Sequence, residues 1–290
     1  MVFLFYFEPV NYINLNGKIQ PGNQPALLVS NRGYRYGDGL FETIKVINEQ
    51  IQLESYHFER LFSGLLLLQF EIPELFIAKT LAGEILDLCK KNECSQQAKV
   101  RLSVFRGHGG LYDENSTLQY VIECWPLNDS ENELNENGLL IDIYGEARKS
   151  ADIFSNLKSA SFLPYMMAAQ YAKKNKLDDC LLLNTNGTIA DSTIANVFII
   201  KDGVIKTPGL PEGCVNGVMR RWLLEKLSSK DHEIREEQIT ITDLEEADEV
   251  FLTNAIKGMS WVKQFRNKFY TNAKTVEIFN RFIKSISRQD

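Results

Sequence analysis

The sequence predicts an α+β protein of two domains, and three observations support this fold class. Signals for short strands and hairpins are mixed with helical periodicity, unlike the regular strand and helix alternation of a doubly wound sheet. The chain has 290 residues, enough for two domains of ordinary size. A polar, acidic stretch interrupts the apolar segments. It predicts one domain over 1–126, a linker over 127–138 and a second domain over 139–290.

Turn signals and hydrophobic periodicity define the elements of the first domain. Asn16-Gly17 and Asn48 each lie between short apolar runs, which predicts a hairpin at each. Leucine and isoleucine recur at helical spacing over 56–70 and 75–91, which predicts two helices. The other predicted elements are strands over 98–106 and 118–125, and an edge strand or interface segment over 1–7.

The second domain mixes strands and helices in the same way. Pro164 suits the first turn of a helix, and Asp202-Gly203 favours a type I′ hairpin turn. The predicted strands cover 139–145, 180–184 and 250–253, and the predicted helices cover 163–176, 217–227 and 275–287.

Composition and charge narrow the class of protein. The formal net charge is −6 and no basic block is present, so nucleic-acid binding is not expected. The apolar N-terminal segment is too short for a signal peptide or a membrane span, so no membrane association is expected. The five cysteines are odd in number and scattered, which indicates reduced thiols in a cytoplasmic chain. Cys89 and Cys94, in a chain with three histidines, do not indicate a zinc site, so no metal is predicted.

Two residues point to a specific chemistry. Lys158 precedes three small residues and a predicted helix. Small neighbours leave room for a cofactor, and a desolvated lysine amine can hold an aldehyde as a Schiff base and act as a base. Asp191 follows 33 residues later in an expected polar turn, where a carboxylate could hold a protonated pyridine nitrogen. The ordinary alternatives are a solvated surface lysine and a turn-capping aspartate. Together, the two residues meet two requirements of pyridoxal 5′-phosphate (PLP) chemistry.

Several segments, in this order, resemble the fold-type IV PLP enzymes, the class IV aminotransferase family. That family includes branched-chain and D-amino-acid aminotransferases and aminodeoxychorismate lyase. The resemblance implies a two-domain fold like that of D-amino-acid aminotransferase, with the cofactor in the interdomain cleft, and a homodimer. The resembling segments are Asn16-Gly17, 32–43, 57–61, those around Lys158 and Asp191, and 253–256.

The resemblance also assigns residues to the cofactor. Lys158 matches the Schiff-base lysine, and Asp191 lies where the family usually has Glu to hold the pyridine nitrogen. Arg60 matches the arginine that binds the PLP phosphate, a role that suits a guanidinium fork; the alternative is a helix-surface arginine in a salt bridge. Two further segments would hold the phosphate, largely through backbone N–H groups: Gly217, Val218 and Met219, and Asn254, Ala255 and Ile256.

The residues that the resemblance assigns to the substrate do not all match the family pattern. Tyr36 and Glu42 lie in a Gly-rich turn that matches an active-site segment, although glycine there also has a purely structural explanation. Arg106 begins an Arg-Gly-x-Gly-Gly segment that looks like that of aminodeoxychorismate lyase. In that enzyme and in D-amino-acid aminotransferases, an arginine about five residues later binds the substrate carboxylate. This chain has Leu111 at that position.

The sequence therefore predicts a PLP-dependent aminotransferase that acts on a small amino acid and a 2-oxo acid through Lys158. One alternative is 4-amino-4-deoxychorismate lyase, which forms 4-aminobenzoate and pyruvate for folate synthesis. Another is a non-catalytic PLP-binding protein. Retention of both the lysine and the carboxylate argues against the last, because binding alone needs no electron sink. The substrate and its stereochemistry stay open.

Overall fold

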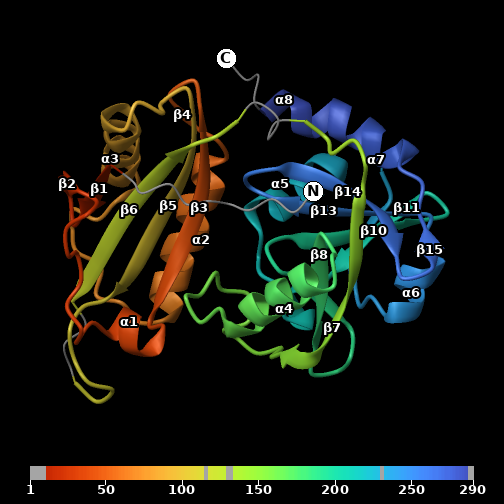
Figure 1. Ribbon diagram of the computed structural model, residues 1–290, viewed down its shortest axis with the longest axis horizontal. Helices are drawn as coiled ribbons and strands as arrows, with labels where there is room; N and C mark the ends of the chain where they lie inside the picture. The colour runs from red at the N-terminus through yellow and green to blue at the C-terminus, as the bar shows by residue number, and fades with distance from the viewer. Residues whose placement is uncertain (1–10, 114–116, 129–132, 229–231, 287–290) are drawn as a thin grey trace. The chain divides into compact units, whose positions relative to one another are not determined.

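The computed structural model describes residues 11–113, 117–128, 133–228 and 232–286. They form two compact units, of which the first contains the elements from β1 to β6 and the second contains those from β7 onward (Figure 1). The short segment Lys158–Ser161 belongs to the first unit, although it comes after β7 in the chain. The predicted segment 1–7 lies outside the described residues, and the predicted domain boundaries stay a prediction.

The first unit is built on an antiparallel sheet with the strand order β2-β1-β6-β5-β3-β4. Alternate residues of β5 are buried, as expected for a strand with one face on a core. The strands are β1 Tyr12–Leu15, β2 Lys18–Pro21, β3 Gly39–Ile47, β4 Gln50–Ile51, β5 Gln97–Arg106 and β6 Leu118–Pro126, and the helices are α1 Arg32–Tyr36, α2 Glu54–Leu67 and α3 Ala78–Lys91. Helix α3 buries Leu81, Ile85 and Leu88, which recur at the helical spacing read from the sequence.

The second unit is built on a mixed sheet with the order β12-β11-β10-β13-β14-β7-β8-β9, and β15 pairs with β14. Strands β8, β9, β10 and β13 are buried along almost their whole length, and β8, β10 and β13 have apolar residues at their centres. The strands are β7 Leu139–Lys149, β8 Asp179–Asn184, β9 Ile189–Ser192, β10 Asn196–Lys201, β11 Val204–Pro208, β12 Ile234–Glu237, β13 Glu249–Asn254, β14 Gly258–Phe265 and β15 Lys268–Phe269. The helices are α4 Leu163–Lys174, α5 Val218–Ser228, α6 Ile241–Glu246, α7 Ala273–Ile278 and α8 Lys284–Ile286, with a 3-10 turn η2 Leu210–Glu212 and a π turn η3 Phe279–Ile283.

The elements predicted from periodicity are confirmed with small shifts of their ends. The hairpin turn at Asp202 and Gly203 has positive φ at both residues, 50° and 80°, as a type I′ turn requires. The helix predicted over 275–287 is continuous through the described residues, from Ala273 to Ile286, and contains a π segment between α7 and α8. The polar turn expected at Asp191 is wrong. The residue lies in β9, whose pairing with β8 holds its backbone extended.

The Lys158 segment pairs with the open edge of β3. Strand β4 covers only the far end of that edge, at Val46 and Ile47. At the other end, the Phe41 N–H donates to the Lys158 carbonyl at 3.0 Å, and the Ala160 N–H donates to the Gly39 carbonyl at 2.9 Å. These bonds fix the backbone at Lys158 on the first unit.

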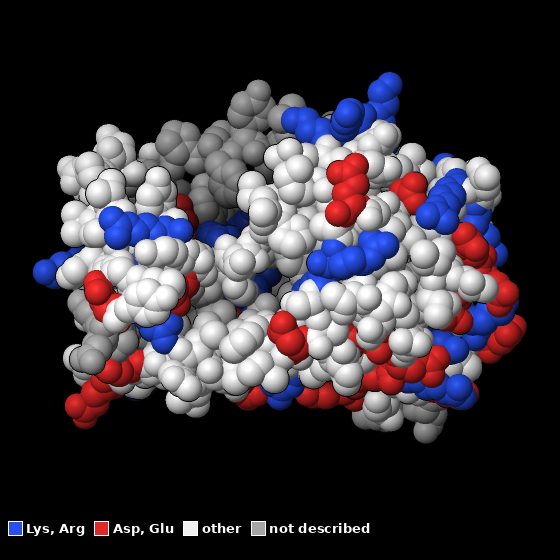
Figure 2. Space-filling view, turned by 90° about the horizontal axis from the view of Figure 1, so that it is seen from below, with Lys and Arg blue, Asp and Glu red and all other residues white. Residues whose placement is uncertain are grey.

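The last two features of the fold concern the charges on the surface and the length of the helices. On the face seen in Figure 2, basic and acidic side chains are interspersed, without an extended basic area. Within the described ranges, no helix is long and apolar enough to cross a membrane.

We expect Gly39→Ala to destabilise the first unit. A Cβ at this position would lie 2.5 Å from the Val104 carbonyl oxygen, so β3 and β5 would have to separate. The expected loss is about 1–3 kcal/mol of unfolding free energy, measured by urea denaturation. Gly83→Ala is the matched control, because a Cβ there meets nothing within 4 Å and the helix interior should gain about 1 kcal/mol. A Gly39→Ala variant as stable as the wild type would contradict the close approach.

Candidate functional site

Lys158 has a fixed backbone and a side chain that is half-buried. Its ammonium lies 4.5 Å from the centre of the Phe41 ring, a cation–π contact with a residue of β3. The next residues are small, and α4 begins at Leu163. The first unit therefore holds this lysine against β3 by both backbone and side chain.

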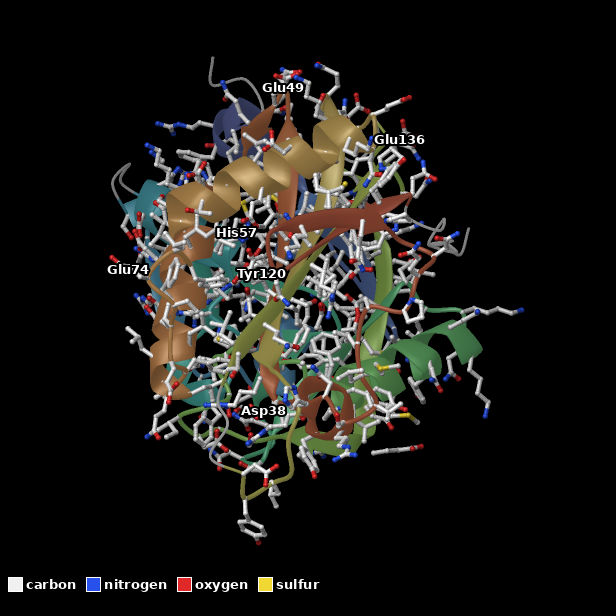
Figure 3. All side chains as sticks on the ribbon, turned by 90° about the vertical axis from the view of Figure 1, so that its left-hand side faces the viewer. Asp38, Glu49, His57, Glu74, Tyr120 and Glu136 are labelled. Carbon is white, nitrogen blue, oxygen red and sulfur yellow. The ribbon has the colours of Figure 1, made fainter. Side chains whose placement is uncertain are left out.

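A buried charged cluster lies on the same strand. Glu42 is 1% exposed and accepts hydrogen bonds from two residues of α2. Its Oε2 lies 2.6 Å from His57 Nδ1, and Arg60 donates from Nε to Oε1 at 2.8 Å and from Nη2 to Oε2 at 2.5 Å. Figure 3 shows His57 of α2 toward the interior of the view, whereas Glu49 and Glu74 lie at its edge.

The protonation states of this cluster follow from its burial and charges. Burial raises the pKa of Glu42, but the Arg60 charge and the His57 hydrogen bond outweigh it and lower the pKa to about 2. Burial lowers the pKa of His57, so its ring is neutral at pH 7 and donates from Nδ1 to Glu42. The cluster is an ionised pair of Glu42 and Arg60 braced by a neutral histidine.

This geometry bears on two residues singled out from the sequence. The salt bridge of Arg60 is buried, with the Arg60 side chain 11% exposed, rather than a surface contact. Binding of phosphate by Arg60 stays a prediction, as does the substrate role of Glu42, whose two oxygens already accept from the chain. His57 was not assigned a role from sequence, although its position three residues before Arg60 on one helix face is a detectable signal.

The other substrate candidates lie around the start of β3, the end at which the Lys158 segment pairs. Arg106 donates from Nη1 to Asp38 Oδ1 at 2.6 Å, and Arg32 donates from Nε to Asp38 Oδ2 at 2.9 Å. Arg106 also donates to two backbone carbonyls that follow α2. Tyr36 is 47% exposed and Leu111 is 58% exposed. Arg106 thus joins the turn before β3 to the end of α2, and its substrate role stays a prediction.

In the second unit, Asp191 is buried and its two oxygens have different surroundings. Oδ2 accepts from Lys149 Nζ at 3.0 Å, from the Tyr165 hydroxyl at 3.1 Å and from the Val215 N–H at 2.9 Å. Oδ1 is buried and has no hydrogen-bond partner within the part of the chain that the structure describes. A buried carboxylate oxygen without a donor is costly, so this atom indicates a donor that comes from a ligand.

The partners of Oδ2 come from three elements around β8. Lys149 ends β7 and Asp191 lies in β9, and these two strands pair with opposite edges of β8. Tyr165 lies in the first turns of α4, where burial and the Asp191 charge raise its pKa well above the usual range, so it stays a donor. Neither Lys149 nor Tyr165 was identified from the sequence, because their pairing with Asp191 is long-range.

A second group of residues brings the start of α5 close to the end of β13. A Cβ on Gly217 would lie 1.9 Å from Asn196 Oδ1, so only glycine fits there. Asn196 pairs with Thr253 across β10 and β13 and donates to the Val215 carbonyl at 2.8 Å. Gly217 has no side chain and lies directly before α5. The N-terminus of a helix is a favourable place for phosphate oxygens.

The loop after β13 is held by its own side chain. Asn254 Oδ1 accepts from the N–H groups of Ile256 at 3.0 Å and Lys257 at 2.8 Å. The Thr253 hydroxyl is buried without a hydrogen-bond partner among the described residues. This hydroxyl was not assigned from sequence. Phosphate binding by Val218, Met219, Asn254, Ala255 and Ile256 stays a prediction.

A family model and the relatives found by comparison with known proteins agree with one another. The family model for amino-transferase class IV matches residues 39–265. An aminodeoxychorismate lyase from Vibrio harveyi is 28% identical to this chain over 82% of it and 86% of the relative. A D-alanine aminotransferase from Listeria innocua is 24% identical over 94% and 96%.

Solved structures support the fold. The branched-chain aminotransferase from Thermoproteus uzoniensis, solved with norvaline, superposes with a TM-score of 0.87. It is 19% identical and covers 96% of this chain and 95% of that chain. A second branched-chain amino acid aminotransferase, solved with pyridoxamine 5′-phosphate, superposes with a TM-score of 0.85 at 19% identity. This likeness confirms the α+β fold of fold-type IV predicted from the sequence.

We expect Glu42→Gln to lower the free energy of unfolding by about 3–5 kcal/mol at neutral pH, because it leaves the buried Arg60 guanidinium without its counter-charge. The loss should depend on pH. Since the folded protein lowers the pKa of Glu42 from 4.5 to about 2, the carboxylate stabilises the fold above about pH 4.5 and loses this contribution as the pH falls toward 2. The difference between wild type and variant should therefore shrink in acid.

Urea denaturation at neutral pH and at several values below pH 4.5 measures this difference. Glu74→Gln is the control, since the same change is made on an exposed side chain. A difference that is small at neutral pH, or constant down to acid, would refute the buried ion pair.

We expect Lys149 and Asp191 to be coupled in stability. Lys149→Met should cost about 1.5–3 kcal/mol, because it removes a charged hydrogen bond from a buried carboxylate. In an Asp191→Asn background the same change should cost less, since the amide carries no charge to neutralise. A double-mutant cycle measured without cofactor should give a coupling of about 0.5–3 kcal/mol, and additive effects would be evidence against the ion pair.

Proposed function

This chain belongs to the amino-transferase class IV family, whose members are PLP-dependent enzymes, and we propose that it moves an amino group between a small amino acid and a 2-oxo acid. The observation that carries the cofactor's part in this proposal is the unequal carboxylate of Asp191. One oxygen is saturated by the chain, and the other is a buried acceptor suited to the N–H of a protonated pyridine.

The residues present fit the cofactor. Asp191 Oδ1 would accept from the pyridine nitrogen, and Lys158 would be the covalent attachment point for the aldehyde carbon. The start of α5 at Gly217, the Thr253 hydroxyl and Arg60 would hold the phosphate. When bound, PLP supplies an electron sink for the carbanion at the substrate Cα.

Each group of the chain would then have a defined task. Lys158 Nζ would take the proton from the substrate Cα and deliver it to the cofactor carbon C4′, as a neutral amine close to both carbons. Lys149 is a positioning residue, because it holds Oδ2 and leaves Oδ1 to face the ligand. Glu42 would orient the Arg60 guanidinium instead of contacting substrate, since both of its oxygens are bonded within the chain.

A second candidate function is that of an aminodeoxychorismate lyase. The 28% identity to the Vibrio harveyi lyase and the Arg106-Gly107-His108-Gly109-Gly110 segment favour it. Against it stands Leu111, an exposed apolar residue where the resemblance calls for a carboxylate-binding arginine. Both reactions would use the same lysine and carboxylate, so the substrate decides between them.

We also propose that the protein is a cytoplasmic homodimer. The family resemblance supports the dimer. All five cysteines are buried and free, which suits a reducing compartment.

A half-reaction screen tests the function. The PLP-loaded protein is mixed with single amino acids or with aminodeoxychorismate. An aminotransferase converts its PLP to pyridoxamine phosphate and releases a 2-oxo acid, whereas the lyase releases 4-aminobenzoate and pyruvate with PLP unchanged. Borohydride should fix the cofactor to Lys158 alone, and Lys158→Ala should abolish turnover. If no substrate yields either pyridoxamine phosphate or 4-aminobenzoate, that result would contradict catalysis and favour simple PLP binding.

We expect Asp191→Asn to retain PLP and to lose turnover by about 10²–10³-fold, a loss typical for one preorganised electrostatic contact. An amide has the same size but cannot hold the pyridine nitrogen in its protonated form. Steady-state rates at saturating PLP measure the loss. Turnover like that of the wild type would reject the cofactor role and leave Asp191 as a structural residue, since Asn would then serve equally well.

A further inference from the structure

Three cysteine thiols converge in the first unit, and none of them is used in the proposed function. Cys89 lies near the end of α3, Cys94 follows that helix, and Cys124 lies in β6. Their Sγ atoms all lie within 4.8 Å of one another, and Cys94 and Cys124 are 3.7 Å apart. Each residue is at most 5% exposed.

Local backbone and an asparagine fix this arrangement. Glu93 adopts a left-handed conformation, with φ at 56°, which turns the chain back after α3. The Cys94 N–H then donates to the Cys89 carbonyl at 3.0 Å. The Asn92 side chain is anchored to both backbone groups of Tyr12 and donates from Nδ2 to Cys124 Sγ at 3.1 Å. The three sulfurs are therefore positioned by hydrogen bonds as well as by apolar packing.

The sulfur of Cys124 accepts two hydrogen bonds, from Asn92 Nδ2 and from the Cys94 thiol at 3.7 Å. The thiolate is the form of cysteine that binds metals. Amide N–H bonds to sulfur are the kind of outer contact that orients metal ligands.

The spacing of the sulfurs also fits an ion. A zinc–sulfur bond is about 2.3 Å long, so three sulfurs around one ion lie about 4 Å apart. The separation of 3.7 Å between the sulfurs of Cys94 and Cys124, and the upper limit of 4.8 Å for all three pairs, fit that value. Three thiolates select soft ions over Mg²⁺ or Ca²⁺.

We propose that Cys89, Cys94 and Cys124 form a buried three-thiolate site for one soft divalent metal ion of the Zn²⁺ class. Binding forms three metal–sulfur bonds and releases to solvent the protons carried by the thiols, with no change of oxidation state. The site does not depend on PLP. Only Cys89 and Cys94 are close in sequence, which predicts no metal site, and Cys124 joins them through the packing of β6 on α3.

Cadmium titration of the reduced, PLP-loaded protein tests the site. We expect one Cd²⁺ per chain by equilibrium dialysis, with a thiolate-to-cadmium ultraviolet band and a rise in the thermal midpoint. Cys94→Ser and Cys124→Ser should each lose the band and the rise. Cys180→Ser is the matched control, because it removes another buried thiol of the same chain and should keep both.

A measurement on the wild type alone guards against variants that do not fold. Because a thiol must lose its proton to bind a metal, uptake of each Cd²⁺ in weak buffer should release protons. Absence of bound Cd²⁺, a band that survives in both cluster variants, or uptake without proton release would overturn the proposal.

Discussion

The buried ion pair of Lys149 and Asp191 is the constraint on which the second unit's chemistry depends. The two residues lie on strands that pair with opposite edges of β8, so their contact at 3.0 Å ties three strands together. Tyr165 from α4 and the Val215 N–H complete the set of donors to the same oxygen. Three donors on Oδ2 fix the orientation of the carboxylate. The same contacts therefore fix the position of Oδ1, which has no hydrogen-bond partner among the described residues.

Strand β3 plays the equivalent part in the first unit. Its backbone at Gly39 and Phe41 holds the Lys158 segment, and its next residue, Glu42, holds Arg60. A lysine on a free loop would lose side-chain and backbone entropy whenever it reached a substrate. Fixing its backbone to a strand removes part of that cost beforehand, which is how a rigid scaffold preorganises a reactive group.

The sequence predicted the fold class and most elements, whereas the roles of the site residues stay predictions. Periodicity located α2 and α3 because their buried leucines recur locally, and the resemblance located Lys158 and Asp191. The turn expected at Asp191 was wrong, because a run of Asp, Ser and Thr reads as polar although β9 buries it. Burial of such residues is tolerated only through partners distant in sequence.

The residues that the sequence did not identify also depend on partners that are distant in sequence. Lys149 looks like any surface lysine until its contact with Asp191 is seen. The role of Cys124 depends on the packing of β6 beside α3, and that of Thr253 on its place at the end of β13. Each acts through a contact made by tertiary pairing, which single-residue patterns do not encode.

The most direct test of the central claim is the protonation state of the pyridine nitrogen. The protein would be reconstituted with PLP carrying ¹⁵N in its ring, and the ring nitrogen observed by NMR at neutral pH. A protonated nitrogen in the wild type, lost in Asp191→Asn and retained in Glu74→Gln, is the result expected if Asp191 Oδ1 accepts from the cofactor. A ring nitrogen that is unprotonated in the wild type, or protonated to the same degree in Asp191→Asn, would contradict it.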